Sequence, residues 1–281
     1  MSIRSLPHKL AAAGAVAAVL ALGFAASAAA TTEPAAKTAP AKPTIVLVHG
    51  AWADASSFAP VTAALLKDGY TVLNAPNPLR GIDIDAASVA AFVNQATTGP
   101  VVLVGHSYGG TVITNAATQT PSVTALVYID AYAPDEGETV IQLTGAKPGS
   151  LLAADPTTVF NFVQYQDDTK QATYDAAYVK PEVFQKIFAA DLPTKQAQVL
   201  ATGQNPLSTL ALGTPSGAPA WKTIKSYFFI GTNDKVIPPA QQLEMANRAN
   251  GVVVKATADH LSMLEVPEKI TDLIEKAAQS K

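Results

Sequence analysis

Residues 101–110 read Val-Val-Leu-Val-Gly-His-Ser-Tyr-Gly-Gly, and this stretch decides the fold. The apolar run at 101–104 predicts a buried strand, and the residues after 110 can continue as a helix. Between them, Gly105-His106-Ser107-Tyr108-Gly109 fits the G-x-S-x-G pattern, which places a serine on a sharp strand-to-helix turn. The strand and the helix pass so close together at this turn that only glycine fits on either side. The stretch therefore predicts a nucleophilic serine, Ser107, at the carboxyl end of a strand.

Short apolar runs typical of strands buried on both faces recur along the chain. They lie at residues 44–48, 101–104, 125–129, 227–230 and 252–254, with a weaker run at 70–73. Helical apolar periods lie between them, at residues 58–65, 89–96 and 243–248, and a last one follows Pro267. This alternation predicts an α/β fold with a mostly parallel, doubly wound sheet and helices on both faces.

The alternation breaks between about residues 134 and 221. This segment is rich in Pro, Gly and Thr, carries scattered aromatic residues and shows no strand period. Residues 181–190 have a helical pattern of apolar side chains. We therefore expect a helical lid insertion over the carboxyl edge of the sheet, with most of its aromatic residues packing the lid onto the body.

The first 30 residues have the pattern of a secretory signal peptide. A basic start with Arg4 and Lys9 precedes an apolar run at 10–26, and small residues suited to cleavage end at Ala28 and Ala30. The alternative is an uncleaved N-terminal membrane anchor. Residues 31–43 carry three prolines and no apolar period, which predicts a disordered spacer before a domain at 44–281. We expect a secreted or periplasmic protein with no stable membrane span after cleavage.

The composition excludes several classes of partner and chemistry. Without residues 1–30, the chain has 17 Lys and Arg against 22 Asp and Glu, a net charge of −5. This balance argues against nucleic acid or an anionic membrane surface as a partner. The chain has no cysteine, which excludes disulfides, thiolate catalysis and Cys-ligated metal.

A serine hydroxyl needs a base to take its proton, and of the four histidines His260 is the best candidate. It lies in the loop between the last predicted strand and the last predicted helix, at the sheet edge where ligands bind. His8 leaves with the signal peptide. His106 is expected to point into the helix-packing region, and His49 has a structural role at least as readily as a binding one.

The acid that orients the histidine should follow another strand. Asp234 comes a few residues after the strand at 227–230 and lies between Ser107 and His260 in the chain, the order the motif favours. Asp130, at the end of the strand at 125–129, is the competing candidate. Each could instead cap a turn, and Asp259 is expected to be a loop or cap residue.

The oxyanion formed by acyl attack needs fixed N–H donors. We expect one from Tyr108, the residue after the nucleophile. The second is expected from Ala51, because Gly50 lets the backbone of this turn approach the site. Trp52 either lines the pocket or packs in the core.

Four stretches in chain order resemble the α/β-hydrolase superfamily: 47–52, 105–110, 233–238 and 259–264. They are most similar to the branch that holds plant methylesterases, hydroxynitrile lyases and many bacterial esterases. The resemblance runs from about residue 44 to residue 278 and is weakest across the lid. It implies an α/β-hydrolase fold, with the site residues in these roles: Ser107 as nucleophile, His260 as base, Asp234 as orienting acid, and Ala51 and Tyr108 as oxyanion donors.

The resemblance also separates two activities of that branch. Its hydroxynitrile lyases have a threonine at the position of Gly50 and a lysine directly after the base, where this chain has Leu261. Those two side chains serve cyanide departure, so their absence favours ester hydrolysis. The serine at the elbow argues against dehalogenases and epoxide hydrolases of this fold, which use aspartate there.

The expected function is an exported serine hydrolase that cleaves carboxylic esters through an acyl-enzyme, with no metal or organic cofactor. The expected partner is a small-molecule ester, hydrophobic because the lid is apolar. Alternatives are other chemistry on the same triad (perhydrolase, lactonase, thioesterase or C–C hydrolase), a cofactor-independent oxygenase, or a ligand-binding protein with residual activity. The sequence does not identify the acyl group or the alcohol group of the ester.

Overall fold

The structure of the chain is a computed structural model that describes residues 42–166 and 172–280. The expected signal peptide at 1–30 and residues 31–41 of the expected spacer lie outside these ranges. Within the described ranges, no helix combines the length and the apolar character needed to cross a membrane.

A six-stranded sheet forms the centre of the domain, in the order β2-β1-β3-β4-β8-β9, and all of its pairings are parallel. The strands are β1 (Thr44–Val48), β2 (Val72–Ala75), β3 (Val101–His106), β4 (Val123–Ile129), β8 (Ser226–Gly231) and β9 (Val252–Ala256). Nearly every residue of the four inner strands is buried, as their continuous apolar runs predict. The weak run at 70–73 becomes the edge strand β2 two residues later, because Tyr70 N–H closes the preceding turn onto the carbonyl of Leu65.

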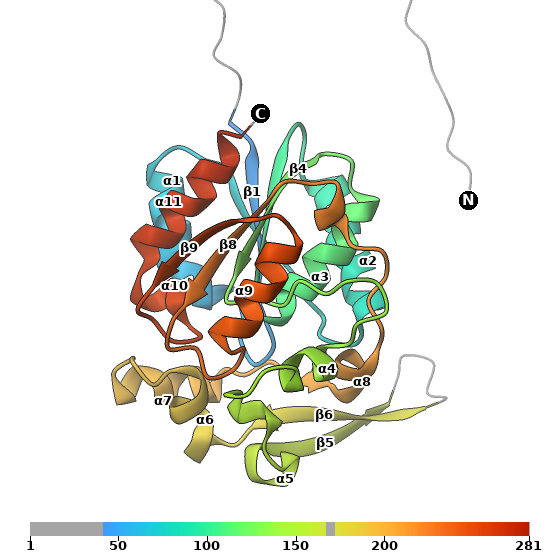
Figure 1. The fold of residues 1–281 in the computed structure, drawn as a ribbon, viewed down its shortest axis with the longest axis vertical. Coiled ribbons are helices and arrows are strands. Elements are labelled where there is room, and N and C mark those ends of the chain that lie inside the picture. The colour runs from blue at the N-terminus through green and yellow to red at the C-terminus, as the bar shows by residue number, and fades with distance from the viewer. Residues whose placement is uncertain (1–41, 167–171, 281) are drawn as a thin grey trace, which may run out of the picture. The chain divides into compact units, whose positions relative to one another are not determined.

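Helices pack against both faces of this sheet (Figure 1). Helices α1 and α11 pack together on one face, and α2, α3 and α9 contact the sheet from the other. Their bounds are α1 (Ala59–Lys67), α2 (Ile82–Ala96), α3 (Tyr108–Ala116), α9 (Pro239–Arg248), α10 (Ser262–Glu265) and α11 (Pro267–Ala278), with short 3-10 helices at Ala55–Phe58 and Ala117–Gln119. The expected α/β-hydrolase architecture, with its mostly parallel sheet, is therefore confirmed.

The insertion between β4 and β8 lies across the end of the sheet where the parallel strands finish (Figure 1). Its helices are α4 (Val140–Gly145), α5 (Pro156–Val159), α6 (Pro181–Phe188), α7 (Thr194–Thr202) and α8 (Thr209–Gly213), with 3-10 turns at Leu151–Ala153 and Ala220–Lys222.

The expectation of a purely helical lid needs a correction. The insertion also contains an antiparallel sheet, made of β5 (Phe160–Gln166), β6 (Thr173–Val179) and the short β7 (Leu207–Ser208). The aromatic residues of 160–178 belong to this sheet, because aromatic side chains fit a pleated, half-buried surface well. Polar residues and alanines interleave with them and hide the strand period in the sequence.

We predict that Gly105→Ala destabilises the domain. A Cβ on Gly105 would lie 2.6 Å from the carbonyl oxygen of Gly109, a contact between two backbones that cannot relax through a side chain. Such overpacking costs about 1–3 kcal/mol, or a fall of roughly 2–12 °C in Tm for a domain of this size. Gly145→Ala is the matched control, because a Cβ there meets no atom within 4 Å. Equal melting temperatures for the two variants would contradict the prediction.

Candidate active site

Ser107 occupies a strained turn between β3 and α3. Its backbone has φ 55° and ψ −123°, a conformation that L-residues avoid at a cost of about 1–3 kcal/mol. Two hydrogen bonds hold the turn, since the Ser107 carbonyl accepts from Gly110 N–H at 3.0 Å and from Tyr132 N–H at 3.2 Å. Residues from α3 and from the chain after β4 thus fix the serine at the sheet edge.

His260 and Asp234 form a chain of hydrogen bonds with this serine. His260 Nε2 lies 2.9 Å from Ser107 Oγ, and His260 Nδ1 lies 2.9 Å from Asp234 Oδ2. Because a carboxylate only accepts, Nδ1–H donates to Asp234 and leaves Nε2 free to accept the serine proton. All three side chains are buried. The three residues that the sequence proposes for nucleophile, base and acid are therefore brought together with the geometry those roles require.

The two competing acids have different surroundings. The carboxylate of Asp234 contacts His260, whereas that of Asp130 accepts from Gly231 N–H at 2.6 Å and from the hydroxyl of Ser262. Asp130 thus joins the ends of β4 and β8 to the start of α10. The sequence favours Asp234 over Asp130, and the geometry agrees, because it brings the Asp234 carboxylate to His260 Nδ1.

Burial sets the electrostatics of the pair. Burial lowers the pKa of His260, so the neutral imidazole that can act as a base is favoured. Burial raises the pKa of the Asp234 carboxyl, and hydrogen bonds from Val236 N–H and Ile237 N–H oppose that rise by favouring the charged form. Gln242 adds a third donor, with Nε2 2.7 Å from Asp234 Oδ2.

Two residues that the sequence does not single out hold His260 in place. His106 Nε2–H donates to the carbonyl of His260 at 2.8 Å, and the two rings pack 4.8 Å apart. Phe188 of α6 packs edge-on against the His260 ring, with a centroid distance of 5.5 Å. His49 instead bonds the backbone of its own turn, through Nδ1 to the Gly50 carbonyl at 2.9 Å. No local pattern points to the contacts of His106 and Phe188 with His260, because they join residues far apart in the chain.

The turn after β1 lies directly against the serine. A Cβ on Gly50 would lie 2.7 Å from Ser107 Cβ, so only glycine lets this turn come so close. Ala51 and Tyr108, the two proposed oxyanion donors, line the same cavity as Ser107. Both residues therefore lie beside the serine, and their role as oxyanion donors stays a prediction.

That cavity has a volume of about 270 Å³ and lies between the sheet edge and the insertion. The insertion contributes the polar Thr144 and Thr209 to its walls, and a larger set of apolar side chains from α4, β5, β7 and α8: Val140, Ile141, Phe160, Phe162, Leu207 and Leu212. Among the described residues that line it, none is an Asp, Glu, Lys, Arg or His. The cavity is therefore suited to an uncharged, apolar group.

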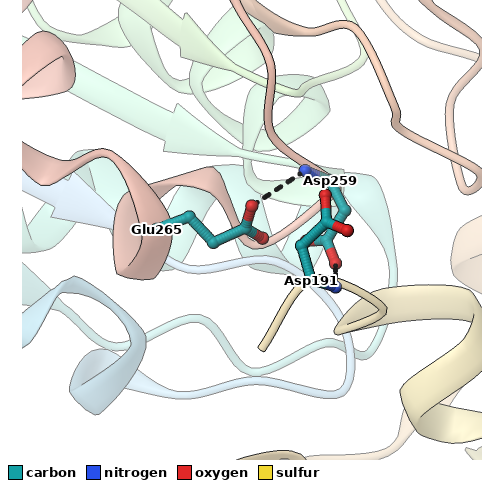
Figure 2. A group of neighbouring side chains, drawn as sticks. All are labelled: Asp191, Asp259 and Glu265. Atoms are coloured by element: carbon teal, nitrogen blue, oxygen red, sulfur yellow. Dashed lines mark hydrogen bonds between the residues drawn. The ribbon is translucent and has the colours of Figure 1, made fainter. Parts of the chain in front are cut away.

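Three carboxyl groups meet beside the loop that carries His260 (Figure 2). Asp191 follows α6 in the insertion, Asp259 precedes His260, and Glu265 ends α10. Asp259 N–H donates to Glu265 Oε2 at 3.2 Å, and Asp191 N–H donates to Asp259 Oδ2 at 2.9 Å. Burial and the neighbouring Asp259 raise the pKa of Glu265 to about 9. A neutral Glu265 therefore relieves the charge repulsion next to the histidine loop.

A nucleophile elbow on a parallel sheet, with a histidine and an acid after later strands, defines the α/β-hydrolase class of proteins. The model of the alpha/beta hydrolase family matches residues 45–273, and the chain belongs to that family. The expectation of a hydrolase is thereby confirmed.

Individual relatives agree with this assignment. The chain is 26% identical to alpha/beta hydrolase nvfD of Aspergillus novofumigatus over 257 residues, which cover 84% of this chain and 97% of that protein. It is 34% identical to the carbendazim hydrolyzing esterase of a Nocardioides species over 110 residues, 35% of this chain and 46% of the esterase. Among solved structures, polyneuridine aldehyde esterase has the same fold, with a TM-score of 0.70, 16% identity, and coverage of 84% of this chain and 99% of that one.

We predict that Glu265→Gln changes how stability depends on pH. The folded-state pKa of Glu265, about 9, lies above the ordinary value of 4.5, so its contribution to stability is present below pH 4.5 and is lost as pH rises through 9. The glutamine cannot ionise, and its amide oxygen can still accept from Asp259 N–H. Between pH 5 and pH 9.5, the Tm of the wild type should therefore fall more steeply than that of Glu265→Gln.

Glu268→Gln removes the same charge from an exposed position in the first turn of α11 and serves as the control. Its Tm should follow the wild type across this pH range. Parallel curves for wild type and Glu265→Gln would show that Glu265 is not neutral in the folded protein.

Proposed function

We propose that this protein is an exported serine esterase that cleaves small, hydrophobic carboxylic esters. The observation that carries the proposal is the hydrogen-bonded chain Ser107–His260–Asp234, which ends at an apolar cavity under the insertion. Esterases among the similar proteins support the choice of ester hydrolysis. Export rests on the basic start and the apolar run in residues 1–30.

The first half of the reaction acylates the serine. Ser107 Oγ attacks the ester carbonyl carbon while His260 Nε2 takes its proton, and Asp234 stabilises the resulting imidazolium. The N–H groups of Ala51 and Tyr108 donate to the oxyanion. The bond between the carbonyl carbon and the alcohol oxygen then breaks, and His260 returns the proton to that oxygen so that the neutral alcohol leaves.

The second half releases the acid. Water attacks the acyl carbon on Ser107, and His260 takes a proton from the water. Collapse of the second tetrahedral intermediate breaks the bond to Ser107 Oγ, which regains its proton from His260. These steps use side chains, backbone amides and water of the site alone.

Cavity chemistry supports a hydrophobic substrate. Leu207, Leu212 and Phe162 offer apolar contact area, and each methylene group buried against such a surface contributes about 0.8 kcal/mol. A charged acyl group would lose its hydration there without gaining a partner.

The test is hydrolysis of p-nitrophenyl esters, from acetate to dodecanoate, by wild type, Ser107→Ala and Ser88→Ala. We expect turnover by the wild type and a loss of at least about 1,000-fold in Ser107→Ala, because the nucleophile is removed. Ser88 lies on α2 and bonds the backbone of its own helix, so Ser88→Ala should behave as the wild type. Undiminished turnover by Ser107→Ala, or no turnover of any ester by the wild type, would contradict the proposal.

A further inference from the structure

The β2–α2 segment, residues 76–85, bonds to both of the turns that carry a candidate oxyanion donor. Asn77 Nδ2 donates to the carbonyl of His49 at 2.8 Å, in the turn after β1. Asp85, in the first turn of α2, accepts from the hydroxyl of Tyr108 at 2.7 Å. One short segment thus reaches both turns that lie beside the nucleophile.

Asp85 is 0% exposed and forms no salt bridge within the described part of the chain. Burying a carboxyl group is costly unless hydrogen bonds satisfy it. Here Arg80 N–H and Gly81 N–H donate to it at 3.0 and 3.3 Å, and the Tyr108 hydroxyl is the third donor. Capping a helix does not require such burial, since Asp155 caps α5 from an exposed position. The contact with Tyr108 therefore explains why this carboxyl group lies inside the domain.

Tyr108 carries its N–H on a strained turn. It follows Ser107, whose φ is 55°, and it is the first residue of α3. Helix N–H groups at this position have no intrahelical acceptor, so Tyr108 N–H is available to an oxyanion. The ring is buried, and its hydroxyl is tied to Asp85. Because the ring and the N–H share one Cα, the bond that fixes the ring also limits movement of the N–H.

Asn77 is buried and holds the other turn in the same way. Its bond to the His49 carbonyl fixes this turn on one side of Ala51. On the other side, Trp52 N–H donates to the carbonyl of Asn205 at 3.0 Å. Ala51 N–H itself forms no hydrogen bond to the described residues, so it is available between two fixed neighbours.

The insertion fixes the β2–α2 segment in its turn. The carbonyl of Leu79 accepts from Ser208 N–H of β7 at 2.9 Å, and the Arg80 guanidinium lies 4.2 Å from the centre of the Tyr165 ring in β5. Leu79 is buried at φ 60°, a conformation that persists only where the surroundings enforce it. The segment is therefore rigid enough to position other groups.

We propose that the β2–α2 segment positions the oxyanion hole, with Asp85 fixing Tyr108 and Asn77 fixing the turn of Ala51; this inference rests on the proposed ester hydrolysis. Both are positioning residues, because neither lines the cavity that Ser107 lines and each acts through a hydrogen bond to a donor-bearing turn. The oxyanion develops only on the way to the tetrahedral intermediate. Loss of either bond should therefore lower kcat and leave substrate binding unchanged.

Tyr108→Phe removes the hydroxyl that Asp85 accepts from and keeps both the ring and the N–H. For p-nitrophenyl butyrate we expect kcat to fall about tenfold, with KM within about twofold of the wild type. This loss is smaller than the roughly 100-fold or greater loss on removing an oxyanion donor, because the N–H is displaced and still present. Tyr128→Phe is the matched control: it removes another buried tyrosine hydroxyl, which bonds Thr114 Oγ1 at 2.9 Å, and should keep the wild-type kcat.

A double-mutant cycle tests whether Asp85 acts through Tyr108. Asp85→Ala should lower kcat in the wild-type background and should lower it no further in Tyr108→Phe. Asn77→Ala acts on the other turn, so its loss should multiply with that of Tyr108→Phe. If Asp85→Ala does not fold, Tyr108→Phe and Asn77→Ala still decide the matter.

A trifluoromethyl alkyl ketone gives a readout that a loss of stability alone would not move. Ser107 Oγ adds to its carbonyl carbon, the serine proton passes to His260, and the resulting oxyanion stays in the hole. The inhibition constant should rise in Tyr108→Phe and Asn77→Ala by the factor by which kcat falls. The methyl ketone of the same chain length binds without an oxyanion, so its inhibition constant should stay at the wild-type value.

The outcomes separate this inference from the proposed function. Wild-type kcat and ketone inhibition in Tyr108→Phe would overturn the role of Asp85, and the same result in Asn77→Ala would overturn that of Asn77, with the esterase function left standing. Equal weakening of both ketones would show a general distortion of the cavity and would also overturn the positioning. No hydrolysis of any ester by the wild type would overturn the proposed function, and this inference with it.

Discussion

The close approach of three backbones around Ser107 is the constraint on which the rest of this structure depends. The serine lies at a positive φ, where a side chain costs energy, and it is kept there because β3, α3 and the turn after β1 meet with no room between them. Gly105 and Gly50 permit that contact, and any side chain at either position would push the elements apart. The hydroxyl is thereby presented to the cavity from a rigid part of the sheet, which keeps its geometry independent of the insertion.

The parallel sheet then brings distant parts of the chain to the same edge. Asp234 follows β8 and His260 follows β9, and parallel strands end on one side of the sheet, so His260 reaches the serine and Asp234 reaches His260. Burial under the insertion favours the neutral histidine, while three donors favour the charged aspartate. Burial therefore keeps the imidazole neutral and able to accept a proton, while the donors to Asp234 oppose the rise that burial causes in the pKa of its carboxyl.

Much of this arrangement can be predicted from the sequence, and the part that cannot has a physical reason. The inner strands lie within one or two residues of the predicted runs, because strands buried on both faces must be apolar throughout. The strands β5 and β6 escape prediction because they are half-exposed and interrupted by polar residues. The contact of His106 with His260 spans 154 positions, and no local pattern encodes such a pairing. Asp130 and Asp234 both follow strands, so the sequence favours Asp234 without excluding Asp130, and the three-dimensional geometry brings Asp234 to the histidine.

The insertion controls access to the catalytic site. Its Phe188 packs against the ring of His260, its Ala177 carbonyl accepts from the indole N–H of Trp52, and its apolar side chains form most of the wall of the cavity beside Ser107. The insertion therefore determines which groups can reach the catalytic residues that the sheet holds in place.

The mechanism depends above all on Ser107 being the nucleophile. It is tested most directly by treating the protein with a fluorophosphonate and locating the adduct by peptide mass spectrometry. We expect one label per chain, on Ser107, with ester turnover lost in proportion to labelling. A label on another residue, or full turnover by labelled protein, would contradict it.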